Sequence, residues 1–199
     1  TLPGTLLSFP GEVPSGINPT NDVDVNGGYT AFRSRCINLS QKPGDPSAAG
    51  IYVNKAGGTV TIADTTMMLP GGEGRFADGF AGVATDDDGT VVFGASDDSS
   101  PSSDTTGIYT TRNGVLETVA DTNTLIPGRT ERFRSFGDAI AHPGNSQEAP
   151  MVAIDDNTIV FVANDRTGIY LSEPDGSLSK VVEKGDRLSG FGRHGNRSK

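Results

Sequence analysis

Three arginines, Arg129, Arg132 and Arg134, lie within six residues of one another in the sequence. Guanidinium groups donate paired hydrogen bonds to oxyanions, so this spacing is suited to clamp a carboxylate or a sulfate group. The simpler alternative is a solvated loop whose positive charge balances an acidic surface. The three arginines are therefore ligand-binding candidates rather than an established site.

An acidic run, Asp86-Asp87-Asp88-Gly89, contains the oxygen ligands that calcium prefers. It does not match the EF-hand loop, because the closing position holds Asp97 instead of glutamate. Asp86 and Asp88 are therefore weak metal candidates, and calcium is the one cofactor hypothesis. A hairpin turn is the simpler role for this run.

Asp97, Asp98 and His142 complete the set of ligand-binding candidates, since they fall in long links between predicted strands. Known catalytic templates are missing from the sequence, including the Gly-x-Ser-x-Gly elbow, His-Glu-x-x-His and the P-loop. We therefore expect no enzyme. Paired carboxylates, a tyrosine or His142 acting on a polysaccharide form the least favoured alternative.

Composition limits the classes of partner. The formal charge of -9 argues against nucleic acid, which requires a basic surface. No apolar run approaches the roughly 20 residues of a membrane span. Cys36 is the single cysteine, so no disulfide can form within the chain. The sequence begins with Thr1, which is consistent with a processed product or with part of a longer protein.

The tripeptide Gly-Ile-Tyr occurs three times, beginning at Gly50, Gly107 and Gly168. Aligning the chain on this tripeptide brings four short apolar segments per copy into phase, as expected for an internal repeat. The first segments are 22–25, 82–85 and 151–154, and the second are 29–32, 90–93 and 158–161. The Gly-Ile-Tyr segment is the third, and the fourth segments are 60–64, 117–121 and 179–183.

These segments are rich in β-branched and aromatic residues and are joined by turns such as Arg112-Asn113-Gly114, which favours strands and hairpins. We therefore predict an all-β protein, a β-propeller-like array of about three four-stranded antiparallel blades. The single repeat domain spans residues 1–199, with units at about 1–68, 69–125 and 126–187. Residues 188–199 hold a partial repeat and a basic tail.

Three blades are fewer than the four to eight typical of propellers. A second copy of the chain or a longer parent protein would complete the ring, and a stacked arrangement is a third option. In a blade, the tight hairpins lie on one face and the long links on the other. Function is most often carried by long loops on a rigid scaffold, so the loop-rich face is the expected interaction face.

The repeat resembles a family of exported bacterial repeat proteins of unknown function, with units built from Gly-Ile-Tyr, Val-Ala-Asp-Thr, Pro-Gly-Gly and Phe. The matching residues of one unit are Gly107 to Tyr109, Val119 to Thr122, Pro127-Gly128, and Phe133 to Phe136. The third unit departs from the pattern at Val182-Glu183-Lys184. The resemblance implies a propeller-like fold and an extracellular or cell-surface location, and it implies no catalytic residues.

We therefore expect a non-enzymatic structural or protein-interaction module that forms homo-oligomers or joins a larger assembly. A glycan-binding module that uses the long links is the alternative, and a polysaccharide hydrolase or lyase is the second alternative.

Overall fold

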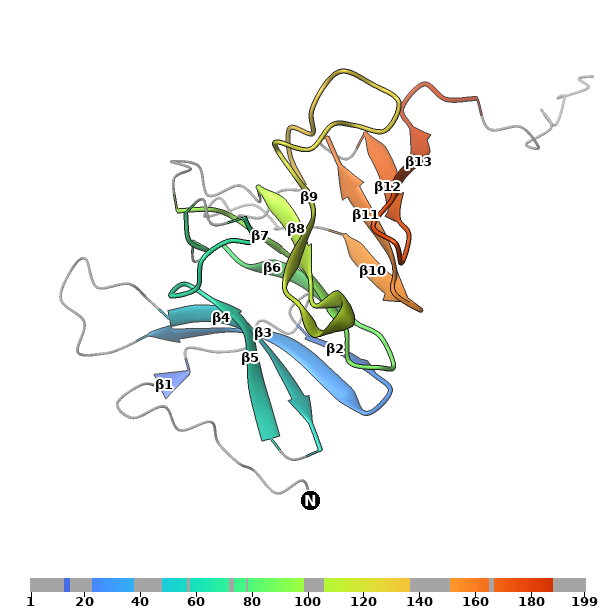
Figure 1. Cartoon of the computed structure of the whole chain (residues 1–199). Coiled ribbons are helices and arrows are strands. Elements are labelled where there is room, and N and C mark those ends of the chain that lie inside the picture. Colours follow the sequence, from blue (N-terminus) through green and yellow to red (C-terminus); the bar gives the residue numbers. More distant parts are fainter. Residues whose placement is uncertain are drawn as a thin grey trace, which may run out of the picture.

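The computed structural model describes residues 13–14, 23–37, 48–56, 58–71, 74–77, 79–98, 106–136, 151–164 and 167–187. It confirms the predicted fold class: three four-stranded antiparallel sheets pack together. The second sheet lies between the other two (Figure 1), because its first strand, β6, contacts both β2 of the first sheet and β10 of the third.

Each sheet is built from four consecutive strands. The first contains β2 (Val23–Asn26), β3 (Tyr29–Ile37), β4 (Ala48–Lys55) and β5 (Gly58–Asp64), and the two-residue strand β1 (Val13–Pro14) pairs with the end of β3. The second contains β6 (Ala81–Thr85), β7 (Val91–Ala95), β8 (Gly107–Thr110) and β9 (Glu117–Asp121). The third contains β10 (Val152–Asp155), β11 (Thr158–Ala163), β12 (Gly168–Ser172) and β13 (Leu178–Glu183).

Turn chemistry explains why the strands end where they do. Asp156 and Asn157, between β10 and β11, have φ values of 46° and 61°, a left-handed conformation that Asn and Asp tolerate. Between β8 and β9, a 3-10 turn (Arg112–Gly114) places Asn113 at φ 56°. The predicted hairpins are therefore confirmed at both kinds of tight turn.

One sequence-based boundary is wrong. We expected residues 33–49 to link two strands, but Arg33 and Arg35 belong to β3 and Ala48 begins β4. The strand continues because both β1 and β4 offer hydrogen-bonding partners to this part of β3. Arg33 instead joins two units, since its Nη1 donates a hydrogen bond to the Phe80 carbonyl at 2.7 Å.

The Gly-Ile-Tyr tripeptide forms the same irregular strand three times. The pairing with the next strand shifts between Ile and Tyr in β4, β8 and β12. Each tyrosine stacks on a phenylalanine of the preceding strand, and the ring centroids of Phe93 and Tyr109 are 5.8 Å apart. The glycine is required by close approach, because a Cβ at Gly107 would lie 2.8 Å from the Tyr109 hydroxyl oxygen.

Two aromatic boxes hold the units together. In the first box, Phe76 and Phe80 from the link after β5 surround Phe93 and Tyr109. The second box repeats this arrangement with Phe133, Phe136, Phe161 and Tyr170. Each box packs on the apolar face of the preceding sheet and forms one of two buried cores. The repeated aromatic residues of the second and third sheets therefore form packing layers between units.

The long links and the tight turns lie on opposite ends of the sheets, as predicted. Long links hydrogen-bond to one another: the Asp98 N–H donates to the Arg75 carbonyl at 2.9 Å, and the Asn164 N–H donates to the Ser135 carbonyl at 2.8 Å. Tight turns meet at the other end, where Arg112 Nη1 donates to the Glu173 carbonyl at 2.9 Å. We call these ends the loop face and the hairpin face. Within the described residues, no helix is long and apolar enough to cross a membrane.

Candidate functional site

The three candidate arginines line one pocket of about 370 Å³ on the loop face, which we call the arginine pocket. It lies beside the link that follows β9. Its lining is Ile126, Arg129, Glu131, Arg132, Arg134, Asn164, Thr167, Glu183 and Lys184. The structure therefore brings Arg129, Arg132 and Arg134 together and adds a fourth cation, Lys184, from the end of β13.

Local hydrogen bonds shape the loop that carries the arginines. The Ile126 N–H donates to the Glu131 carbonyl at 2.9 Å, and the Phe133 N–H donates to the Thr124 carbonyl at 3.1 Å. The Phe133 ring is buried in the second aromatic box, so it anchors the loop between two arginines. The Arg134 N–H donates to Asn164 Oδ1 at 3.0 Å, which ties the loop to the link before β12.

Glu183 forms the acidic side of the arginine pocket. Its carboxylate accepts hydrogen bonds from the Arg129 guanidinium and from the Tyr170 hydroxyl. Burial, together with the hydrogen bond to Glu183, raises the pKa of Tyr170 to about 12, so the phenol stays protonated and donates. Glu183 thus fixes Arg129, whereas no hydrogen bond or ion pair of the Arg132 and Arg134 guanidinium groups occurs among the described residues.

A second pocket of about 450 Å³ occupies the equivalent place one unit earlier, and we call it the acidic pocket. Asp97 and Asp121 are the charged residues of its described lining, which also includes Leu69, Thr106 and Tyr109. These correspond by position to Ile126, Thr167 and Tyr170 of the next unit. Burial raises the pKa of Tyr109, and the nearby Asp121 and Asp97 charges add to the effect. The fold thus forms the same pocket twice, with opposite charge.

The remaining loop-face candidates have separate positions. Asp98 is structural, because its Oδ1 accepts the Arg75 N–H at 3.0 Å and fixes the neighbouring link. Asp97 lines the acidic pocket rather than the arginine pocket. His142 lies outside the described residues. Asp64 and Asp121 cap local turns: the Asp64 carboxylate accepts the Thr66 N–H at 2.8 Å, and the Asp121 carboxylate accepts the Asn123 N–H at 2.9 Å.

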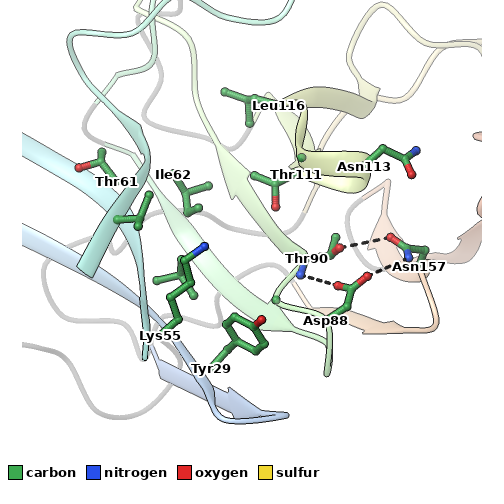
Figure 2. Close-up of a pocket in the computed structure, with 14 residues that line it drawn as sticks. Tyr29, Lys55, Thr61, Ile62, Asp88, Thr90, Thr111, Asn113, Leu116 and Asn157 are labelled. Atoms are coloured by element: carbon green, nitrogen blue, oxygen red, sulfur yellow. Dashed lines mark hydrogen bonds between the residues drawn. The ribbon is translucent and has the colours of Figure 1, made fainter. Parts of the chain in front are cut away.

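A third pocket, of about 560 Å³, opens on the hairpin face between the first and second sheets, away from the face that the sequence favoured. Tyr29 and Lys55 line it on the first-sheet side, with Asp88, Thr111 and Asn113 opposite (Figure 2). Thr90, Asp88 and Asn157 are joined by hydrogen bonds at its edge (Figure 2). These polar atoms already bond to one another, and we assign no ligand to this pocket.

Asp86 and Asp88, the weak metal candidates, tie the second unit to the third. The Thr90 N–H donates to both carboxylates, at 3.0 Å and 2.8 Å, and Asn157 donates to them from the next unit. Burial and the adjacent Asp88 raise the pKa of Asp86 to about 6, and the hydrogen bond from Asp86 lowers the pKa of Asp88 to about 2. The described residues contain no group of three or more His, Cys, Asp or Glu side chains suited to a metal ion.

The hydrogen-bonded pair of Asp86 and Asp88 also bears on the hydrolase alternative. The two catalytic carboxyl groups of glycosidases stand roughly 5–10 Å apart, which leaves room for the sugar or a water between them. Asp86 and Asp88 instead accept the same Thr90 N–H, at 3.0 Å and 2.8 Å, so the two carboxyl groups lie against each other. This pair therefore does not have the separation that glycoside hydrolysis requires.

The two ends of the array expose residues that are buried inside it. Ile51 and Ile108 are fully buried under the next unit, whereas Ile169, at the same position of the third sheet, is 36% exposed. At the other end, Val25 of β2 is 66% exposed, whereas the equivalent Thr85 and Ile154 are 2% and 9% exposed. Sequence reasoning expected an incomplete ring and did not identify these exposed sheet faces.

The fold and its pockets define an all-β array of propeller-like units with repeated aromatic boxes, two charged loop-face pockets and two open ends. The chain belongs to the family of unknown function DUF7453, whose model matches residues 17–195. No curated protein matches the chain significantly.

Proposed function

We propose that this protein is a non-enzymatic interaction module whose copies associate end to end, the third sheet of one copy packing on the first sheet of another. The observation that carries the proposal is the exposure of Ile169 at a position where Ile51 and Ile108 are fully buried. The resemblance described above supports an extracellular or cell-surface setting for such assemblies.

The open face of the third sheet repeats the apolar surface that receives an aromatic box elsewhere in the chain. Inside the array this surface is formed by Val92, Ile108 and Ala120 of the second sheet. The corresponding residues of the third sheet are Val160, Ile169 and Val182, and Val181 beside them is 55% exposed. An exposed apolar surface of this kind marks a protein–protein contact.

The first sheet offers the matching partner surface. Its Phe32 and Tyr52 rings stack at 5.7 Å and 25°, nearly the geometry of the Phe161–Tyr170 pair at 5.7 Å and 27°. The Tyr52 ring is 5% exposed, so Val23 and Val25 of β2 form the exposed part of this surface. Both halves of the internal interface are therefore present on one chain, at opposite ends of the array.

Contacts between different surfaces produce a closed ring when the rotation closes, and an open chain of copies when it does not. Two copies would supply six sheets, within the range of closed propellers. We expect a closed dimer, and a concentration-dependent series of larger species would equally support end-to-end contact.

The test uses Val181→Asp, which charges the third-sheet end, and Val25→Asp, which charges the first-sheet end. Each variant alone should be monomeric in size-exclusion chromatography with light scattering, because each lacks one half of every contact. Mixing the two variants should restore a dimer through the one intact pair of surfaces. Val115→Asp is the matched control, since Val115 is an exposed valine of the hairpin face, and it should associate like wild type.

Far-ultraviolet circular dichroism and thermal unfolding would check that the charged variants stay folded. A wild-type protein that is monomeric at high micromolar concentration would overturn the proposal. Association that survives both charged substitutions would also overturn it, since the contact would then lie elsewhere.

A further inference from the structure

We propose that the arginine pocket binds a carboxylate or sulfate group carried on an acidic polysaccharide. This binding function is separate from the end-to-end association, because the pocket lies on the loop face rather than on the open sheet faces. The chain has 16 Lys and Arg residues against 25 Asp and Glu, yet four of these cations line this one pocket. Such a concentration of positive charge on an acidic protein favours a local anion site over general adsorption.

The comparison with the preceding unit shows that these cations are not needed to build the loop. The segments 69–76 and 126–133 align without a gap, and both make the same backbone contacts, including the Met68–Arg75 and Leu125–Arg132 bridges. Arg129 and Arg134 take the positions of Gly72 and Ala77. The recurring backbone contacts therefore do not depend on arginine at either position.

The arginine common to both loops has a different role in each. In the first loop, the Arg75 guanidinium donates to the Thr66 carbonyl of its own unit. In the second loop, Arg132 lines the pocket, and its guanidinium has no hydrogen-bond or ion-pair partner in the described part of the chain. Among the described residues, neither the Arg132 nor the Arg134 guanidinium group has a partner, so both offer paired donors that match the geometry of carboxylate and sulfate groups.

The pocket also contains two carboxylates, which affect the balance of charge. The Glu183 side chain is 8% exposed and accepts hydrogen bonds from Arg129 and Tyr170. Its negative charge is therefore paired with Arg129, which reduces its repulsion of an anionic ligand. Glu131 is exposed and is the other acidic residue of the described lining. Arg132, Arg134 and Lys184 therefore leave an excess of positive charge for the ligand.

The openness of the site favours a polymer over a small free acid. Pockets for small molecules enclose most of the surface of their ligand. Here the arginines, Glu131, Thr167 and Lys184 are all exposed. A chain lying across the loop face can place one acidic group among the arginines while its neighbouring sugars remain in solvent.

The experiment is a binding titration by calorimetry at low and at physiological salt. The probes are oligogalacturonate for carboxylates, dextran sulfate for sulfates, neutral dextran as the uncharged polymer, and free galacturonate and inorganic sulfate as small anions. We expect at least one anionic polymer to bind and neutral dextran not to bind. Equal affinity for a free anion, compared per acidic group, would reassign the site to small anions and overturn the polysaccharide assignment.

Arg132→Gln and Arg134→Gln should each weaken binding about tenfold, the usual effect of losing a hydrogen bond between charged groups. Arg132→Lys keeps the charge and loses the paired donors, so it should recover only part of the affinity. Arg75→Gln is the matched control, since it removes the equivalent arginine from a loop whose pocket has no described cation. Equal losses in the Arg75 and Arg132 variants, or no anion binding by the wild type, would overturn the proposal.

Discussion

The interface between the first and second units and the interface between the second and third units have the same core and different polar edges. In both, four aromatic rings pack on an apolar sheet face, and corresponding ring pairs such as Phe76–Tyr109 and Phe133–Tyr170 meet edge to face. The polar residues at the edges of the two interfaces differ. The first has an acidic loop-face pocket, and the second has the arginine pocket.

This contrast separates residues that build the fold from residues that are free to take a specific role. A position that recurs in every unit, such as the tyrosine of Gly-Ile-Tyr, is accounted for by packing. A position that differs beside recurring backbone hydrogen bonds, such as Arg134 after Phe133 where the earlier unit has Ala77 after Phe76, is not required for those bonds. Comparing the units of an internal repeat therefore separates the residues that the fold requires from those that it does not require.

Truncating the shared core should have the largest effect. Phe133→Ala removes a buried ring that contacts Phe136, Phe161 and Tyr170, so it should lower the free energy of unfolding by about 3–5 kcal/mol. Phe76→Ala in the first box should cost a similar amount if the two interfaces share one core. Chemical denaturation followed by circular dichroism would measure both.

Val115→Ala provides the control for this pair, because Val115 is exposed and its truncation should change the free energy of unfolding by less than about 0.5 kcal/mol. A cost that is large in only one of the two boxes would contradict the equivalence of the interfaces.

The glycine of Gly-Ile-Tyr allows a finer comparison. A Cβ at Gly168 would lie 2.5 Å from the Tyr170 hydroxyl oxygen and within 2.7 Å of two ring carbons, closer than the 2.8 Å found at Gly107. Gly168→Ala should therefore displace the Tyr170 ring from its box and destabilise the protein by about 2–3 kcal/mol, with a smaller loss for Gly107→Ala. Thermal unfolding would rank the two variants.

Ser179→Ala, an exposed change on the neighbouring strand, should leave the melting temperature nearly unchanged. A Gly168→Ala variant with the melting temperature of the wild type would contradict this prediction, because the position of the tyrosine ring would then not depend on the absence of a Cβ at residue 168.

The sequence was sufficient to predict most of this common core. The in-phase recurrence of the segments that contain Phe93, Phe161, Tyr109 and Tyr170 predicted equivalent strands, because residues at one position of a repeat occupy one environment. The same alignment separated the loop face from the hairpin face. These are local properties of each unit, so they can be read from one copy and transferred to the next.

The sequence did not show what depends on contacts between distant segments or on an end of the array. Arg129 and Glu183 are separated by 54 residues, and no local pattern predicts that they pair. The exposure of Ile169 likewise follows from the absence of a described unit beyond the third sheet, although its tripeptide is identical to the buried copies. Arg132 was identified by its type, while its difference from Arg75 required the structure.

The smallest expected effect concerns the hairpin face, where Asp86 and Asp88 belong to the second interface. The pKa of Asp86 is raised to about 6 in the folded protein, above its ordinary value of 3.8, so folding favours the protonated carboxyl. The stability that this proton provides is complete at low pH and is lost as pH rises through 6. From pH 4.5 to pH 7.5, the free energy of unfolding should fall by about 1–2 kcal/mol through this group.

Asp86→Asn isolates that contribution, because the amide keeps an acceptor for the Thr90 N–H and a donor toward Asp88 without carrying charge. The variant should gain stability relative to wild type as pH rises, measured by denaturant unfolding at several pH values. The pKa of Asp88 is lowered to about 2, so its contribution to the free energy of unfolding changes mainly below this pH range. Asp156→Asn, in the equivalent turn of the third unit, should keep the wild-type pH dependence. If Asp86→Asn kept it too, the protonated Asp86 carboxyl would not be the source of the pH dependence.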